Sequence, residues 1–191
     1  VSFSSFVPRW RGERGKQKAI ELMARDECRQ LIAISEHSAE LQRDVLSHYR
    51  PSLQQSVLPK LRVMHPAQRL LVEQFDDKPL PNDRIVFTIV GAAFFRKGGT
   101  EILRAAADLI DEGYPLELNI ISRMKFGDYA SRSTEQHLKA AQELISRYPD
   151  HIHYYERLPN AEVLDLFRAS HVGLLPTYDD AYGYSVLESQ G

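Results

Sequence analysis

From residue 85 onward, short apolar runs alternate with stretches that have the composition and the apolar spacing of helices. Short continuous apolar runs are typical of strands that are buried on both faces, as in a parallel sheet. The predicted strands are residues 85–90, 116–121, 152–155 and 171–175. Repeated strand–helix units favour an α/β fold, a mostly parallel sheet with helices on both faces.

The stretches between these strands predict helices. Thr100, Ser133 and Asn160 are placed to cap them, because side chains of these types accept backbone N–H bonds. Gly113 predicts the end of the first of these helices, and the last is expected to begin near Ser185. Ligands of such sheets bind outside the carboxyl ends of the strands. The segments of functional interest are therefore 91–99, 122–130, 156–160 and 176–184.

Fewer signals precede residue 76. Residues 17–28 have helical composition, 30–34 and 61–64 are predicted strands, and Ser35 caps a predicted helix that Pro51 ends. The composition then changes: residues 76–83 contain two prolines, three aspartates and an asparagine, which is typical of a linker. The predicted domains are therefore 1–75 and 85–191, joined by a linker at 76–84.

The overall composition excludes several classes of protein. Of the 191 residues, 43% are hydrophobic and 26% are charged, as in globular proteins, and the net charge of −2 gives no attraction to nucleic acid. Cys28 is the only cysteine and the seven histidines lack the spacing of metal ligands, so no metal is expected. No apolar run approaches the roughly 18 residues of a membrane span. Residues 1–11 do not resemble a signal peptide, so the cytoplasm is the simplest compartment.

Both ends of the sequence look cut. The chain begins with Val1 rather than Met, and only about two helical turns follow Ser185. We therefore expect a fragment, truncated at both ends.

The segment after the fourth predicted strand combines an acid, a glycine turn and a helix start. Backbone amides at Tyr184 and Ser185 would face a ligand, and the helix dipole would favour an anion there. Gly183 allows a ligand to approach the backbone closely. Asp180 and Glu188 flank this turn with seven residues between them.

This pattern resembles the hallmark of family 4 of the retaining glycosyltransferases, also called group 1 glycosyl transferases. There, an acidic residue and a Glu enclose seven residues that include an aromatic–Gly pair, here Tyr182 and Gly183. Lys97–Gly98 resembles a second family segment, the first loop of the donor domain, in which an Arg and a Lys grip the donor pyrophosphate. Ala92 stands where that Arg would be.

The resemblance implies a GT-B type fold, in which two Rossmann-like domains, with parallel sheets and helices on both faces, hold the donor between them. Residues 1–75 would be the C-terminal part of the acceptor-side domain, and 85–191 an incomplete donor-binding domain. The implied activity moves a hexose from a nucleotide-diphosphate sugar to a saccharide or lipid-linked acceptor, with retention of configuration. It needs no metal and no other cofactor.

The resemblance also implies roles for particular residues. Lys97 would neutralise the pyrophosphate, Asp180 would bind sugar hydroxyls, and Glu188 would hold the ribose. Lys97 and Asp180 are thus the predicted catalytic residues. The predicted donor-binding residues are Gly91, Lys97, Tyr182, Gly183, Tyr184, Ser185 and Glu188.

Other interpretations stay open. Ala92, and Glu156 in place of a family glycine, are compatible with a degenerate, non-catalytic relative that binds a nucleotide or a partner. A sugar-nucleotide epimerase on the same scaffold is a third hypothesis. Asp180, Glu188 and Lys97 could also be solvated surface residues. The basic cluster at residues 9–18 could make peripheral contact with anionic lipid, although a solvated segment is the simpler interpretation.

Overall fold

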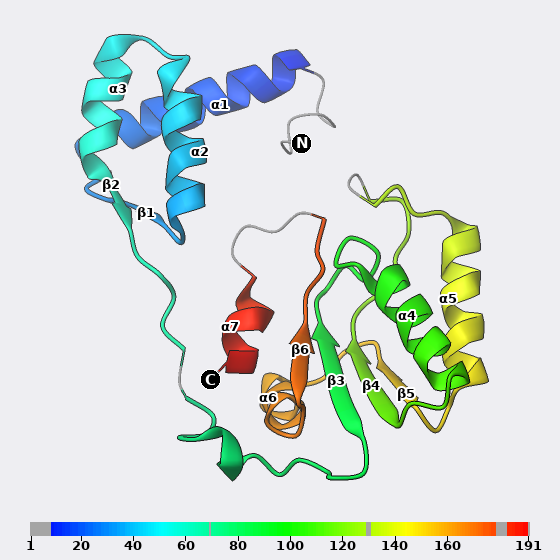
Figure 1. Cartoon of the computed structure of the whole chain (residues 1–191). Helices are drawn as coiled ribbons and strands as arrows, with labels where there is room; N and C mark the ends of the chain where they lie inside the picture. Colours follow the sequence, from blue (N-terminus) through cyan, green and yellow to red (C-terminus); the bar gives the residue numbers. More distant parts are fainter. Residues whose placement is uncertain (1–8, 69, 129–130, 179–182, 191) are drawn as a thin grey trace. The chain divides into compact units, whose positions relative to one another are not determined.

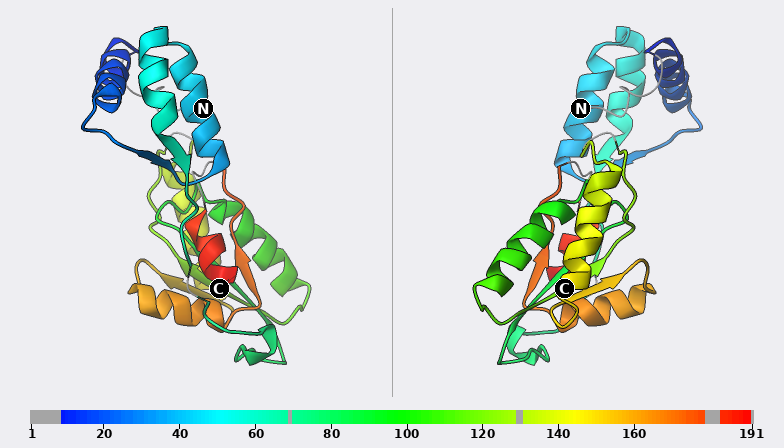
Figure 2. Two further views of the ribbon diagram at one scale, coloured as in Figure 1. Left: turned by 90° about the vertical axis from the view of Figure 1, so that its left-hand side faces the viewer. Right: turned by 90° about the vertical axis from the view of Figure 1, so that its right-hand side faces the viewer.

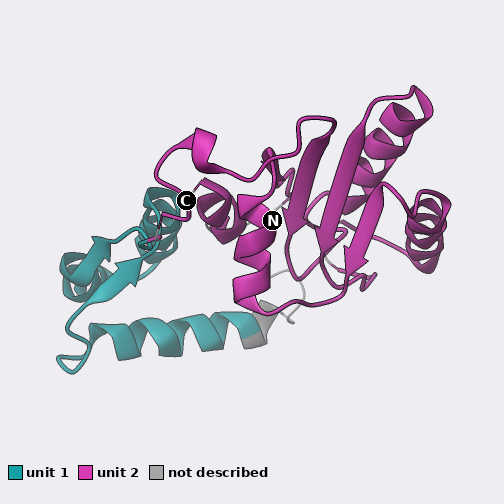
Figure 3. Ribbon diagram, turned by 90° about the horizontal axis from the view of Figure 1, so that it is seen from below, with its two compact units in different colours: residues 1–67 teal, residues 68–191 magenta. Residues whose placement is uncertain are grey.

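The computed structural model describes residues 9–68, 70–128, 131–178 and 183–190 (Figure 1). The chain forms two compact units, Val1–Ala67 and Gln68–Gly191 (Figure 3). The predicted linker, 76–84, lies within the second unit. Side chains hold this segment there: the Lys78 ammonium donates to the Ser170 carbonyl oxygen at 2.6 Å.

The described part of the first unit contains two short parallel strands, three α-helices and one 3-10 helix. Ser35 caps the second helix as predicted, since its hydroxyl accepts the Ser38 N–H at 3.0 Å. That helix ends at Ser47, before Pro51. Pro51 instead begins another helix, which was not predicted; proline is well suited to the first turn of a helix. The elements are α1 (Arg9–Ala24), β1 (Leu31–Ala33), α2 (Glu36–Ser47), α3 (Pro51–Val57), the 3-10 helix η2 (Leu58–Lys60) and β2 (Leu61–Val63).

The second unit contains a four-stranded parallel sheet with the strand order β5-β4-β3-β6. Strands and helices alternate along the chain, which confirms the predicted α/β class. After the 3-10 helix η3 (Phe75–Asp77), the elements are β3 (Ile85–Val90), α4 (Gly99–Asp111), β4 (Leu116–Ile121), α5 (Glu135–Arg147), β5 (Ile152–Tyr155), α6 (Asn160–Arg168), β6 (Val172–Leu174) and α7 (Tyr184–Gln190).

Helices cover both faces of this sheet. Ile120 packs in a core cluster with Leu103 of α4, whereas its neighbour Ile121 packs with Val163 and Phe167 of α6. Consecutive residues of a strand point to opposite faces, so one continuous apolar run supplies both clusters. Figure 2 shows α4 and α6 on opposite sides of the strands.

Three predicted helix starts are off by one or two residues. Gly98, rather than Thr100, is the residue at the N-cap of α4. Thr134 forms the capping box of α5 with His137, because the predicted cap, Ser133, instead bonds within the preceding loop. Asn160 is already the first residue of α6 and follows the N-cap Pro159.

Candidate functional site

Two loops leave neighbouring strands at the same edge of the sheet. β3 pairs with β6 in parallel, with Ile89 opposite Leu174, so the chain segments after both strands begin side by side. These segments are two of those that the sequence analysis selected, and they contain Lys97 and the acid–glycine turn.

Two aromatic side chains anchor the β3–α4 loop. Phe94 and Phe95 are buried and pack edge to face, with ring centroids 5.1 Å apart and an angle of 82° between the rings. A Cβ atom on Gly99 would lie within 2.5 Å of three Phe94 ring carbons, so the ring fills the space above the first residue of α4. This anchor was not predicted from the sequence, in which its only sign is an aromatic pair immediately before the basic residues.

Lys97 and Gly91, both predicted to be donor-binding residues, lie against each other. A Cβ atom on Gly91 would come within 2.9 Å of Lys97 Cγ and 3.4 Å of Cδ, so the aliphatic stem of Lys97 crosses over Gly91. The Gly91 N–H donates to the Ile121 carbonyl oxygen at 3.0 Å, and the Ser122 hydroxyl donates to the Gly91 carbonyl oxygen. Gly91 is therefore held at the end of the sheet, where it supports the Lys97 stem.

The β3–α4 loop is in direct contact with the β6–α7 loop. The Arg96 carbonyl oxygen accepts the Tyr178 N–H at 3.0 Å and the Thr177 hydroxyl at 3.3 Å. A Cβ atom on Gly98 would lie 2.8 Å from Pro176 Cγ and still closer to the Pro176 carbonyl oxygen. The residues on both sides of Lys97 are thus packed against residues 176–178.

A side-chain hydrogen bond adds to this contact. The Tyr178 hydroxyl donates to Glu101 Oε1 at 2.7 Å. This bond to the carboxylate is the main reason why the pKa of Tyr178 is raised, because ionisation of the phenol would remove the donor. Neither residue was selected from the sequence. Tyr178 lies within segment 176–184, which was selected from the sequence. Its partner Glu101 is far away in the chain, so no local pattern predicts the bond.

Glu188 lies in a second group of contacts. Asn160 Nδ2, at the start of α6, donates to Glu188 Oε1 at 3.5 Å, which places Glu188 beside the segment that follows β5. α7 packs closely on β6, since a Cβ atom on Gly173 would lie 2.6 Å from Ser189 Oγ. Glu188, in the helix that follows segment 176–184, thus contacts Asn160, the last residue of segment 156–160.

The predicted residues of the turn itself are only partly described. Gly183 lies just before α7, and its carbonyl oxygen accepts the Val186 N–H at 2.9 Å. Tyr184 and Ser185 form the first turn of α7, close to the predicted start of that helix. Asp180 and Tyr182 lie outside the described residues, so their predicted roles stay predictions.

Two observations concern metals and membranes. In the described ranges, no group of three or more His, Cys, Asp or Glu side chains is arranged to hold a metal ion. None of the helices in that part of the chain combines the length and the apolar character that crossing a bilayer requires.

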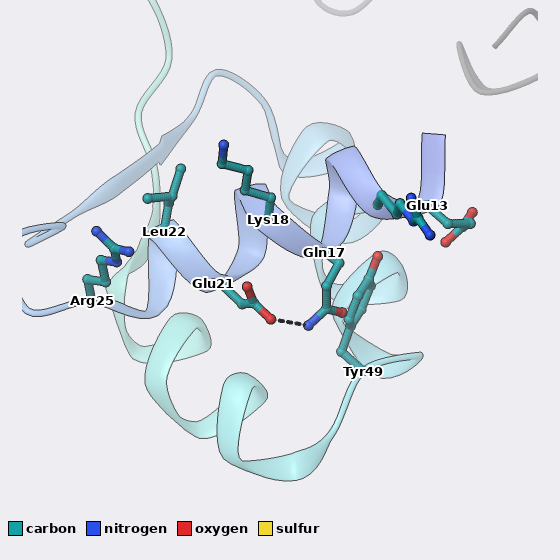
Figure 4. A pocket seen from close by; sticks show the side chains of 8 residues that line it. Glu13, Gln17, Lys18, Glu21, Leu22, Arg25 and Tyr49 are labelled. Atoms are coloured by element: carbon teal, nitrogen blue, oxygen red, sulfur yellow. Dashed lines mark hydrogen bonds between the residues drawn. The ribbon is translucent and has the colours of Figure 1, made fainter. Parts of the chain in front are cut away.

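A separate surface hollow lies along α1 in the first unit (Figure 4). Its lining carries charges of both signs, from Lys18 and Arg25 as well as Glu13 and Glu21. Glu21 accepts a hydrogen bond from Gln17 at 2.6 Å. The lining is thus mixed rather than purely basic, and the predicted contact of the basic cluster with anionic lipid stays a prediction.

Comparison with known proteins identifies a similar fold. No protein-family model matches the sequence, and no curated protein matches it. Among solved structures, the chain is similar to the crystal structure of WaaG, a glycosyltransferase involved in lipopolysaccharide biosynthesis, with 17% sequence identity and a TM-score of 0.63. The match covers 99% of this chain and 48% of that one, so the chain spans about half the length of the structure that it resembles. The chain has an α/β fold, with parallel sheets flanked by helices, that matches half of a GT-B glycosyltransferase.

Proposed function

We propose that this chain carries the donor-binding half of a retaining glycosyltransferase, which moves a hexose from a nucleotide-diphosphate sugar to a saccharide or lipid-linked acceptor. One observation carries the proposal. Lys97 and Gly98 lie in a loop at the carboxyl end of β3, packed against the loop that follows the adjacent parallel strand β6. This is the edge at which sheets of this kind bind ligands. The similarity of fold to a glycosyltransferase supports the same reading.

The chemistry of the proposed site centres on charge neutralisation. As the bond between the sugar and the β-phosphate breaks, negative charge builds up on the leaving diphosphate. A preorganised cation at that point stabilises the transition state. Lys97 is proposed to supply it, with its stem held over Gly91. Because Ala92 offers no charge where the family has an Arg, Lys97 would carry a larger share of the neutralisation.

Polar groups around the turn would complete the site. The backbone amides of Tyr184 and Ser185 are proposed to donate to the diphosphate, and Asp180 to bind sugar hydroxyls. Glu188 is proposed to accept hydrogen bonds from the ribose, with Asn160 steadying its carboxylate at 3.5 Å. No step of this proposal requires a metal.

Lys97→Ala is expected to weaken the binding of a nucleoside diphosphate by about 10- to 100-fold, because hydrogen bonds to charged groups contribute about 1.5–3 kcal/mol. Calorimetric titration of the full-length protein with UDP, GDP and ADP would measure this loss and identify the base. The matched control is Lys139→Ala, which removes an exposed lysine of α5 that pairs with Glu135. If the wild type bound none of the three nucleotides at millimolar concentration, the proposed function would be wrong.

Glu188→Ala is expected to weaken the same nucleotide by about tenfold, through the loss of a charged acceptor for the ribose hydroxyls. A 2′,3′-dideoxy analogue separates this role from a general disturbance of α7. The wild type should lose affinity for the analogue, whereas Glu188→Ala should bind both ligands equally. Gln190→Ala, at an exposed position of the same helix, is the control. A further loss of affinity for the analogue in Glu188→Ala would exclude the ribose contact.

Ala92 favours a second candidate, a non-catalytic relative that binds a nucleotide without transferring its sugar. The two candidates make the same binding predictions but differ in turnover. Transfer to an acceptor, or hydrolysis of any sugar nucleotide, by the full-length protein would reject the second candidate. Incubation with the donor alone also tests for an epimerase, since epimerisation needs no acceptor.

A further inference from the structure

We propose that Tyr178 and Glu101 are a positioning pair that holds the Lys97 turn in the geometry needed to receive a diphosphate. Tyr178 is attached on both sides of that turn. Its backbone N–H donates to the carbonyl oxygen of Arg96, the residue before Lys97, at 3.0 Å. Its hydroxyl donates to Glu101 in the first turn of α4, which follows Lys97, at 2.7 Å. This inference rests on the proposed function of Lys97.

Tyr178 and Glu101 contribute little to the core. Tyr178 is 59% exposed, and Glu101 is an exposed residue of α4. Beside the pair lies a polar cavity of about 90 Å³, whose lining includes Thr100, Arg104 and Ser133. A polar cavity of this size can hold water, so the pair borders a solvent-accessible space rather than the core. Burial of the Tyr178 ring therefore does not explain why Tyr178 lies against Glu101. The hydrogen bond of the Tyr178 hydroxyl does.

The bond itself is of the kind that fixes geometry. A hydroxyl that donates to a carboxylate makes a short, charge-assisted hydrogen bond, about twice as strong as a neutral one. The other contacts of the two loops restrain the backbone of Arg96 and the close packing of Gly98 on Pro176. The Tyr178 side chain extends this restraint one residue pair further, past the N-cap Gly98 to Glu101 in the first turn of α4. A misplaced ammonium loses much of its effect on an anion, because both charge attraction and hydrogen bonding depend on distance.

The test is a double-mutant cycle between Tyr178 and Lys97, measured as the dissociation constant of the nucleoside diphosphate in the full-length protein. Tyr178→Phe is expected to weaken binding by about 3- to 10-fold while the melting temperature stays within about 2 °C of the wild type. In the Lys97→Ala background, the same change is expected to have no effect. Tyr114→Phe is the matched control, because Tyr114 is 56% exposed and lies beyond the opposite end of α4.

A second pair of variants tests the partner. Glu101→Gln keeps an oxygen that can accept from the Tyr178 hydroxyl and is expected to retain most of the affinity, whereas Glu101→Ala should match Tyr178→Phe. An unchanged affinity in Tyr178→Phe, or an equal loss with and without Lys97, would overturn the positioning pair while leaving the proposed function in place. If the wild type itself bound no nucleoside diphosphate, the proposed function and this inference would both be overturned.

Discussion

Gly98→Ala is expected to lower the free energy of unfolding by about 2–5 kcal/mol, the sum of backbone strain and a steric clash. Gly98 has a φ of +77°, and this left-handed conformation costs an L-residue roughly 1–2 kcal/mol. The new Cβ atom would also lie 2.8 Å from Pro176 Cγ and closer still to the Pro176 carbonyl oxygen. Because the backbone supplies part of this clash, it can be relieved only by separating the two loops of the site.

Gly113→Ala is the matched control for this prediction. Gly113 has a similar φ of +86°, but nothing lies within 4 Å of the position of its missing Cβ. It should therefore show the backbone strain alone, about 1 kcal/mol after the smaller entropy of the unfolded chain is taken into account. Urea denaturation of both variants measures the difference, and nucleotide titration of Gly98→Ala should show weakened binding. Equal losses of stability would mean that the two loops can separate at little cost.

Phe94→Ala is expected to lower the free energy of unfolding by about 3–5 kcal/mol, the usual effect of removing a fully buried aromatic ring. Phe94 is 0% exposed and contacts Phe95. The effect should reach the site, because the Phe94 ring packs on Gly99, the residue that follows the Lys97–Gly98 turn.

The control for Phe94 is Phe126→Ala, which removes a ring that is 50% exposed in the β4–α5 loop. Such a change should stay within about 0.5 kcal/mol of the wild type. Chemical denaturation of the two variants compares a buried and an exposed phenylalanine in the same unit. A loss below about 1 kcal/mol for Phe94→Ala would contradict the role of this ring as the anchor of the loop.

The strands of the second unit could be predicted closely because their signal is local. Residues 85–90, 116–121 and 152–155 were predicted as strands and are strands in the structure. Helix starts were less accurate, because neighbouring polar residues compete for the cap. Ser133 and Thr134 are adjacent, and the side chains of both can accept a backbone N–H. Thr134 is the cap because Ser133 makes its hydrogen bonds within the preceding loop.

Tertiary structure decided what surrounds each candidate residue. The sequence by itself determined the α/β class and the segments that follow the carboxyl ends of the strands. It also identified Lys97 as a candidate site residue. These conclusions rest on apolar periodicity and short motifs, which are properties of neighbouring residues. It could not show that the Lys97 stem crosses Gly91, that Gly98 packs on Pro176, or that Tyr178 bonds to Glu101. The first contact is set by the path of a single loop, whereas the other two join residues that are distant in the chain. Those two exist only because β3 and β6 pair in parallel and bring their loops to one edge of the sheet.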